Sequence, residues 1–402
     1  MPSDVELAVK AQGYLHELCR EIGIRRVGSP GNRRATAFFA QIASSFGHRL
    51  ETVAFDCCDW ENRGVSLNVA GRPFKANASP YSLGCRVQRN LASAGTLAEL
   101  EKGEFAGQVL LLYGELSKEQ LMPKNFPFYN PDEHKHLIAV LEQKRPAAIV
   151  AATTRNPELV GALYPFPLFV DGDFDIPSAY MTEREGRRLR ALVGQPCALN
   201  IETARIPALG YQITAVAGEC QKRRVVCFAH IDAYEDSPGA LDNASGTVML
   251  LLLAELLKGC EGGPRVELVA MNGEDHYSAA GEKMWVRDND GRFDEIVLGI
   301  NVDDIGFREG HSSFSLYGCP DALAQTVRET FQAFPGLMEG EAWYQGDHGL
   351  YIQNAVPAVA LTSEPMAGLM RSYTHTKKDV PELIAPPSWL RPHVPSSSCS
   401  GG

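Results

Sequence analysis

The 402-residue sequence lacks any hydrophobic run long enough to cross a lipid bilayer. Its longest apolar stretch, from Val248 to Leu257, is interrupted by Glu255 and is shorter than the roughly 20 apolar residues that a membrane-spanning helix needs. The first residues also lack the basic segment followed by an apolar one that marks a secretory signal peptide. These absences predict a cytoplasmic protein with no membrane partner.

An excess of positive charge is missing as well. Asp and Glu number 49 against 38 Lys and Arg, which gives a formal net charge of -11. Proteins that bind nucleic acid neutralise its phosphates with clustered Lys and Arg. Nucleic acid is therefore not an expected partner, and we attribute the acidity to solubility.

The ten cysteines lack the spacing of a redox or zinc motif. None forms a CxxC pair, and the adjacent Cys57 and Cys58 suit neither a zinc hairpin nor an easy mutual disulfide. In a protein without an export signal this pattern predicts mostly reduced thiols.

Alternating strand and helix patterns dominate the chain from residue 212 onward. Apolar runs predict buried strands at residues 223–229, 266–271 and 296–302, and helical periodicity predicts helices at residues 244–257 and 278–287. Such alternation predicts an α/β fold with a mixed, mostly parallel sheet flanked by helices. Near the N-terminus, the same criteria predict helices at residues 4–22 and 32–46 and a strand at residues 50–56.

The middle of the chain has a different character, with short strands separated by Gly and Pro. We expect strands at residues 108–112, 147–152 and 176–181 and helices at residues 132–143 and 183–192. The order FAGQVLLLYGEL, HLIAVLEQKRPAAIVAAT, DIPSAYMTEREGRRLRALV resembles a protease-associated domain, a small β-rich module inserted in several peptidases. The tail from Pro386 is rich in Pro, Ser and Gly and is expected to be disordered.

Polar residues that could carry chemistry gather where the predicted strands end, which is where α/β proteins bind ligands. Each has an ordinary reading alone; Asp242, for example, could simply cap a helix. Two histidines with several carboxylates, however, match the ligands that zinc prefers, and an excess of carboxylates suits two metals sharing a bridging ligand. The set is His230, Asp232, Asp242, Glu274, Asp275, Asp303, Asp304 and His375.

These segments resemble a known family, the co-catalytic zinc peptidases (clan MH) that include bacterial leucyl aminopeptidases, glutamate carboxypeptidases and glutaminyl cyclases. The matching strings are FAHIDAYEDSPGALDNASG, VAMNGED, GINVDDIG, QGDHGLYIQNAVPAVAL and YTHTKKD, in the family's order. The first string is the most specific, because a strand is followed by HxD, a Gly-rich loop and DNxSG at the start of a helix.

The resemblance implies a phosphorylase/hydrolase-like catalytic domain from residues 1–58 and 206–385, interrupted by the protease-associated-like domain at residues 59–205. It implies two zinc ions, one of them replaceable by another divalent metal, bridged by Asp242. His230 and Asp303 would complete one site, and Asp275 and His375 the other. Glu274 would be the catalytic base, and Asp232 would orient His230. Asp379 and the pair Asp347-His348 would have structural roles.

Three positions depart from the family's usual pattern. Asp275 stands where Glu is usual, and its shorter side chain bears on metal affinity and identity. Asp304 stands where Met is usual, and we assign Asp303 as the ligand because it keeps the spacing from Asn301 to Gly306. A Tyr often precedes the last His, whereas here Thr374 does and Tyr373 is one place earlier, so Tyr373 is a candidate for oxyanion stabilisation.

The sequence leaves several functions open on this fold. An aminopeptidase needs acidic groups for the substrate's free amine, and Glu235, Asp236 or Asp304 could serve. A carboxypeptidase or dipeptidase needs a cation, and Arg371 or Lys377 could serve. A glutaminyl cyclase and a non-catalytic binding protein are the further alternatives. The expected function is a zinc-dependent exopeptidase acting on peptides, with aminopeptidase favoured; the oligomeric state stays open.

Overall fold

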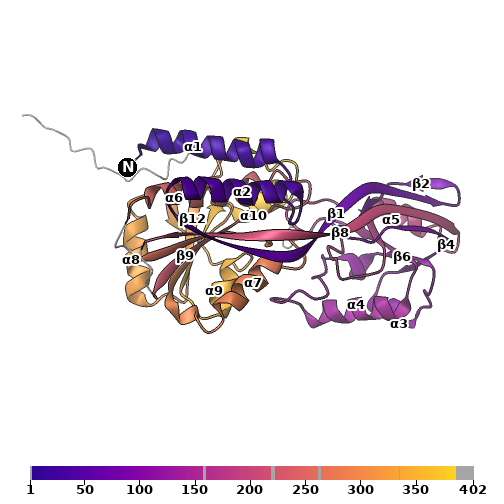
Figure 1. Ribbon diagram of the computed structural model, residues 1–402. Coiled ribbons are helices and arrows are strands. Elements are labelled where there is room, and N and C mark those ends of the chain that lie inside the picture. Colours follow the sequence, from indigo (N-terminus) through magenta and orange to yellow (C-terminus); the bar gives the residue numbers. More distant parts are fainter. Residues whose placement is uncertain (1, 157–159, 219–221, 261–263, 335, 386–402) are drawn as a thin grey trace, which may run out of the picture.

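The chain forms two lobes joined by a pair of long strands (Figure 1). The computed structural model describes residues 2–156, 160–218, 222–260, 264–334 and 336–385. The larger lobe is built from the N-terminal helices and the C-terminal half of the chain, and the smaller lobe from the middle. The predicted disordered tail lies outside the described residues.

A mixed sheet forms the centre of the larger lobe. Its strand order is β13-β12-β14-β11-β9-β10-β8, and the neighbours from β14 to β10 all run parallel. Strands β8 and β12 pair antiparallel with β10 and β14. The mixed, mostly parallel sheet is therefore confirmed. The bounds are β8 Pro196–Ala217, β9 Arg224–His230, β10 Arg265–Met271, β11 Ile296–Val302, β12 His311–Tyr317, β13 Leu337–Glu339 and β14 Ala358–Glu364.

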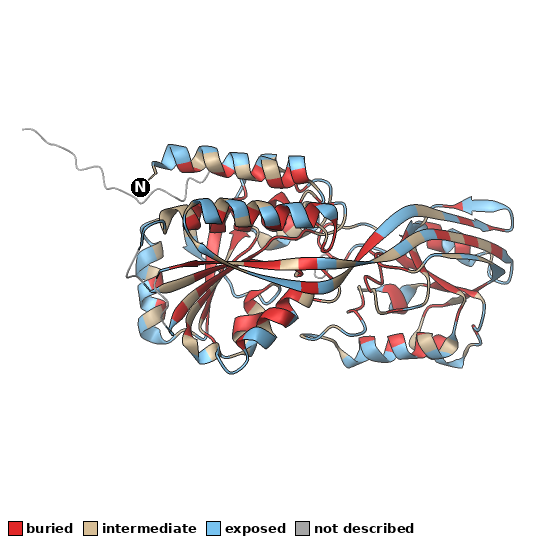
Figure 2. Cartoon of the chain, viewed as in Figure 1, coloured by how far each residue is buried: buried red, intermediate tan, exposed pale blue. Residues whose placement is uncertain are grey.

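Helices cover both faces of this sheet because its central strands are apolar on both sides. Cys227 and Ala229 of β9 pack toward the helices of one face, while Val226 and Phe228 pack toward the other. Figure 2 shows the resulting buried residues along the strands and along the helix sides turned toward them. The first face carries α1 Asp4–His16, α2 Pro30–Ser45 and α6 Gly246–Leu256, and the second carries α7 Ala280–Asn289 and α9 His348–Gln353. Helices α8 Asp321–Phe331 and α10 Met366–Ser372 complete the lobe.

The starts of the first two helices follow from their capping residues. Ser3 accepts a hydrogen bond from the backbone N–H of Glu6, whose carboxylate accepts one from the Ser3 backbone in return. Ser29 caps α2 in the same way, and Pro30 occupies the first turn, where its missing N–H has no cost. A π-helical segment, Glu17–Ile22, continues α1, so the predicted helix at residues 4–22 is confirmed.

The two strands that join the lobes are much longer than the sequence indicates. Strand β1, Arg49–Val69, pairs antiparallel with β8 from Arg49 opposite Val216 to Val69 opposite Cys197. The predicted strand at residues 50–56 is thus correct in type but too short. The proposed domain boundaries, after residues 58 and 205, fall inside these two strands and stay a prediction.

The smaller lobe continues from β8 through the strand order β4-β5-β6-β7-β3. The predicted elements are found there as β5, α4, β6, β7 and α5, whereas the likeness to a protease-associated domain stays a prediction. The strands are β2 Arg72–Phe74, β3 Asn77–Ala78, β4 Cys85–Ala94, β5 Val109–Leu112, β6 Ala148–Thr153 and β7 Ser178–Thr182. The helices are α3 Leu97–Lys102, α4 Asp132–Lys144 and α5 Glu183–Arg190.

The described residues bear on the cysteine thiols and on membrane-spanning helices. All eight cysteines in the described part of the chain carry free thiols, Cys57 and Cys58 among them. Among the same residues, no helix is both long and apolar enough to cross a membrane.

Candidate metal centre

The candidate ligands meet at one edge of the parallel strands. His230 is the last residue of β9, Asp275 lies in the loop after β10, and Asp303 directly follows β11. Because parallel strands end at the same edge of a sheet, these loops lie side by side. Asp242 comes from the turn before α6 and His375 from the loop after α10.

Two groups of donor atoms share Asp242. Its Oδ1 lies 3.1 Å from His230 Nε2, which is also 3.4 Å from Asp303 Oδ1. Its Oδ2 lies 3.1 Å from His375 Nε2, which is also 3.2 Å from Asp275 Oδ1. Each oxygen of this one carboxylate therefore faces a different histidine and a different second carboxylate.

These separations also match the spacing of ligands around one metal ion. Four ligands about 2.0–2.1 Å from a zinc ion form a tetrahedron with edges of about 3.3 Å, close to the observed spacings. Both ring nitrogens of His230, Nδ1 of His375 and Oδ1 of Asp303 are buried without a hydrogen-bond partner in the described part of the structure. Buried polar atoms left this way are costly, and a cation between them would satisfy those that face it. The donors of each group lie within 4.8 Å of one another and could hold a metal ion.

The electrostatics of the cluster also favour a cation. Burial would raise the pKa of Asp242, but the imidazoles of His230 and His375 hold it far below its usual range. Burial likewise opposes charge on the two imidazoles, yet Asp303 and Asp242 raise the pKa of His230, and Asp275 and Asp242 that of His375. The carboxylates thus stabilise positive charge at both positions, and metal ions and protons compete for them.

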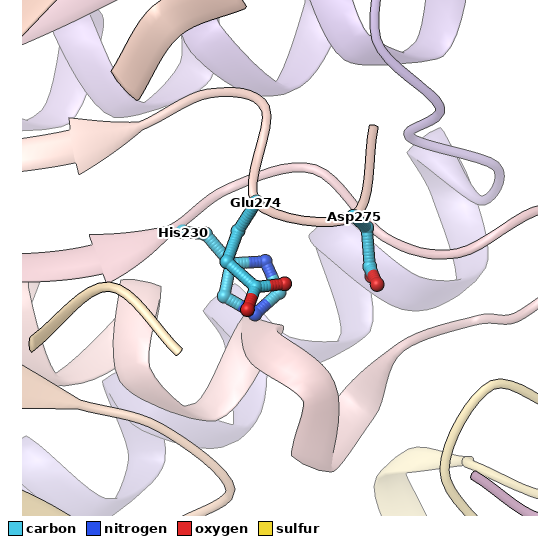
Figure 3. A group of neighbouring side chains, drawn as sticks. All are labelled: His230, Glu274 and Asp275. Atoms are coloured by element: carbon cyan, nitrogen blue, oxygen red, sulfur yellow. The ribbon is translucent and has the colours of Figure 1, made fainter. Parts of the chain in front are cut away.

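Glu274 lies beside the ligands. It forms a further group with His230 and Asp275, and Figure 3 shows its carboxylate over the His230 ring, on the loop that also carries Asp275. Burial raises the pKa of Glu274 well above its usual range; the charge on His230 lowers it, while Asp275 and Asp303 raise it further. A carboxylate in this position could take up and release a proton next to a bound metal.

Two further aspartates hold the loops that carry the ligands. Asp232 accepts hydrogen bonds from the backbone N–H groups of Gly273 (2.8 Å) and Asp275 (3.1 Å). Its Oδ1 is 3.8 Å from His230 Nδ1, too far for a hydrogen bond, so its predicted effect on that imidazole stays a prediction. Asp379 accepts hydrogen bonds from the backbone N–H groups of Leu241 (2.7 Å) and Asp242 (3.1 Å), which positions the shared carboxylate.

The two neighbouring aspartates after β11 differ in their surroundings. Asp303 belongs to a donor group, whereas Asp304, with φ +54°, belongs to none of those found among the described residues. Loss of a residue that only hydrogen-bonds to a metal ligand typically lowers metal affinity by about 10–100-fold. We expect Asp303→Asn to lower metal affinity by more than this, and Asp304→Asn to lower it by less than about tenfold. Titration against a competing chelator measures both affinities, and the reverse order would reassign the ligand.

The aromatic ring at the site is one that the sequence did not single out. Tyr234 stacks on His375, with ring centroids 4.5 Å apart and planes at 11°, and its buried hydroxyl has no partner among the described residues. Tyr373 instead packs against Phe307 at 5.7 Å. Tyr234 lies in the most specific string, after HxD, but local pattern does not tell which histidine it will face.

The remaining candidates belong to none of the donor groups found among the described residues. The side chain of Arg371 is exposed, and its backbone carbonyl accepts a hydrogen bond from Arg155. Asp347 and His348 are buried, and His348 Nε2 lies 2.8 Å from the carbonyl oxygen of Trp343. Their predicted roles stay predictions.

Solved structures with the same fold include two aminopeptidases. A zinc aminopeptidase from Bacillus subtilis matches with a TM-score of 0.74 and 18% identity over 95% of this chain and 92% of that one. An aminopeptidase from Aneurinibacillus sp. strain AM-1 matches with a TM-score of 0.70 and 18% identity, over 94% and 89%. A peptidase M28 precursor from Shewanella amazonensis matches with a TM-score of 0.66 and 16% identity, over 96% and 92%.

A family model supplies the evidence from sequence. No curated protein matches the chain significantly. Residues 213–391, however, match the model of peptidase family M28, and this range contains all five candidate ligands and Glu274. Over this region, which is a little under half of the chain, the sequence is similar to peptidase family M28.

Proposed function

We propose that this protein is a zinc-dependent exopeptidase that removes residues from the amino ends of peptides. His230 and Asp303 would hold one zinc ion, Asp275 and His375 would hold the other, and Asp242 would be a ligand common to both. The observation that carries the proposal is the position of Asp242, whose two oxygens each lie 3.1 Å from Nε2 of a different histidine. A zinc aminopeptidase among the structures of the same fold supports the metal and the reaction.

The metals and Glu274 have different roles in the proposed reaction. Zinc ions in such a site lower the pKa of water and polarise the scissile carbonyl, so no nucleophilic side chain is needed. Glu274 takes the proton from the attacking water and then gives it to the leaving amine.

The charge beside the site supports cleavage from the amino end. The cavity next to His375 is lined by the carboxylates of Glu235 and Asp236 and by one cation, Lys377, whose Nζ lies 3.7 Å from Asp236 Oδ2. The charges of Asp236 and Lys377 balance, so ionised Glu235 gives this cavity a net negative charge. A free amino group is attracted to such a cavity, and the terminal carboxylate that a carboxypeptidase must bind is repelled.

Substrates with matched blocked and free ends test the direction of cleavage. We expect hydrolysis of leucyl and lysyl p-nitroanilides and none of their N-acetylated forms. Release of the C-terminal residue from an N-blocked dipeptide would contradict the proposal and favour a carboxypeptidase.

Metal removal should abolish activity and lower stability together. A ligand at 100 times its Kd stabilises the folded state by about 2.7 kcal/mol, so chelation is expected to lower the Tm by several degrees. Zinc should restore both activity and Tm, and elemental analysis should find two ions per chain. Fewer than about one ion per chain after chelator-free purification would contradict the two-metal site.

A further inference from the structure

A cavity of about 320 Å³ lies between the two lobes and opens beside His375. Residues of the connecting strand β1 and of β7 in the smaller lobe line one side of the cavity. The loops after β9 and α10 in the larger lobe line the other side. Its lining includes Trp60, Tyr180, Tyr234, Glu235, His375 and Lys377. Because one wall is a candidate metal ligand, a substrate bound at the metals extends directly into this cavity.

Glu235 contributes a carboxylate whose counter-charge, Arg26, lies at the outer limit of an ion pair. Its side chain is only 16% exposed, and the nearest cation is Arg26, whose Nη1 lies 4.0 Å from Glu235 Oε1. Arg26 is already engaged, because it donates hydrogen bonds of 2.7 Å to Asp59 and to the carbonyl of Trp60. No hydrogen bond to the Glu235 side chain is found among the described residues, which leaves its oxygens available to a ligand in the cavity.

Aromatic side chains form the walls around this carboxylate. Trp60, Tyr180 and Tyr234 all line the cavity. Aromatic faces pack well against the methylene stem of a long side chain and attract a cation at its end. The hydroxyl of Tyr234 is buried without a partner in the described structure and can accept a hydrogen bond from such a cation.

The charged groups that act on Glu235 are different from the candidate metal ligands. Burial raises the pKa of Glu235 to about 8, with Arg26 opposing and Asp236 and Asp59 adding to the rise; none of the five ligands contributes. In a substrate, only Cα separates the α-amine from the scissile carbonyl carbon, so the α-amine stays near the metals. A lysine ammonium, in contrast, lies on a four-carbon stem, on the order of 6 Å from its Cα. A cation on such a stem can therefore reach Glu235 while the α-amine stays near the metals.

We propose that this cavity binds the side chain of the substrate's N-terminal residue and that Glu235 selects a long cationic side chain, lysine or arginine. The inference rests on the proposed aminopeptidase function and specifies its substrate class. Lys377 does not cancel the selection, because Asp236 pairs with it at the exposed side of the cavity.

The variant Glu235→Gln tests the proposal with a pair of substrates that differ by one charge. Lysyl and norleucyl p-nitroanilides share the four-carbon stem, and only the first carries an ammonium group. We expect the zinc-loaded protein to prefer the lysyl substrate by at least about tenfold in kcat/KM, and the variant to lose about 10–100-fold on it. The norleucyl substrate should change by less than about threefold.

The control is Glu104→Gln, which makes the same chemical change at an exposed residue outside the cavity. It should leave both substrates unaffected. An equal loss on both substrates in Glu235→Gln would mean that Glu235 only supports the structure, and an unchanged preference would mean that the side chain binds elsewhere. Either result overturns the proposal.

Binding measurements separate this inference from the proposed function. If no aminoacyl substrate is hydrolysed, the aminopeptidase assignment fails, but calorimetry with lysinamide and norleucinamide still tests the cavity. The wild-type protein should bind lysinamide at least about tenfold more tightly, and Glu235→Gln should remove the difference. Equal affinities in the wild-type protein would overturn the cavity's role.

The preference should also depend on pH. Since Glu235 must be ionised to attract a cation and its pKa is about 8, the lysyl-to-norleucyl ratio should rise from pH 7 to pH 9. Using a ratio cancels the titration of the α-amine, which the two substrates share. A ratio independent of pH in the wild-type protein, or one that rises equally in Glu235→Gln, would contradict the role of Glu235. The other titratable groups around it are Arg26, Asp59, Tyr81, Tyr180, Tyr234, Asp236 and Lys377.

Discussion

Glu274→Gln is expected to lower kcat by about 10²–10⁴-fold while both metal ions stay bound. Glutamine keeps the size of the side chain but cannot take a proton from water. Glu274 belongs to a donor group with His230 and Asp275, yet the two groups that share Asp242 are complete without it. Steady-state kinetics and elemental analysis of the same preparation therefore separate loss of the base from loss of metal.

The control for Glu274→Gln is the same change at Glu329, an exposed residue of α8. That variant should retain wild-type kinetics. Near-full activity in Glu274→Gln would show that another group acts as the base. Loss of one metal ion together with activity would instead make Glu274 a ligand.

Asp242→Asn is expected to remove both metal ions and to lower kcat/KM by about 10³-fold or more, since metals contribute several kcal/mol to catalysis. An amide carries no charge, and its nitrogen cannot replace the oxygen that faces the second histidine. One substitution thus damages both sites, because the two oxygens of Asp242 belong to different donor groups. Zinc titration followed by kinetics measures the two effects.

The comparison for this variant is Asp56→Asn at an exposed position of β1, which should bind zinc normally. Circular dichroism should show the fold retained in Asp242→Asn, because Asp379 still binds the backbone of residues 241 and 242. Retention of one tightly bound zinc ion by Asp242→Asn would show that the sites do not depend on a shared carboxylate.

The parts of the structure that the sequence predicts well are those that depend on local pattern. The short apolar runs ending at His230 and before Asp303 become parallel strands, because buried strands of such sheets are apolar on both faces. Once those strands are parallel, the residues after them meet at one edge. This is why the ligand candidates could be found as a group before any distance was known.

The length of β1 depends on its pairing with the distant strand β8, which the local sequence pattern does not indicate. From Cys57 to Gly64 the chain has few alternating apolar residues, so a strand prediction stops there. The strand continues because β8, more than a hundred residues later, supplies hydrogen bonds along it, with one irregularity between Asn62 and Gly64. Non-local pairing of this kind overrides local propensity.

The sequence does not show which aromatic or acidic residue lies beside the candidate metal ligands, because this also depends on non-local contacts. Tyr373 is the expected ring by its position next to the last histidine, yet it packs on Phe307, and Tyr234 faces His375. Glu235 was one of three acidic candidates for a substrate amine. Burial distinguishes it from Asp236, because the Glu235 side chain is 16% exposed, whereas that of Asp236 is 58% exposed and faces Lys377.

The ladder of β1 and β8 makes the whole smaller lobe equivalent to the loop of a β-hairpin. The chain leaves and returns at facing residues, such as Asp59 opposite Ile206, so these two strands are the covalent connection of the segment between Val69 and Pro196 to the larger lobe. Lengthening a hairpin loop leaves the order of the other strands unchanged, and the entropy of closing it grows only slowly with length. The length of the smaller lobe can therefore change without altering the strand order of the sheet that carries the candidate ligands.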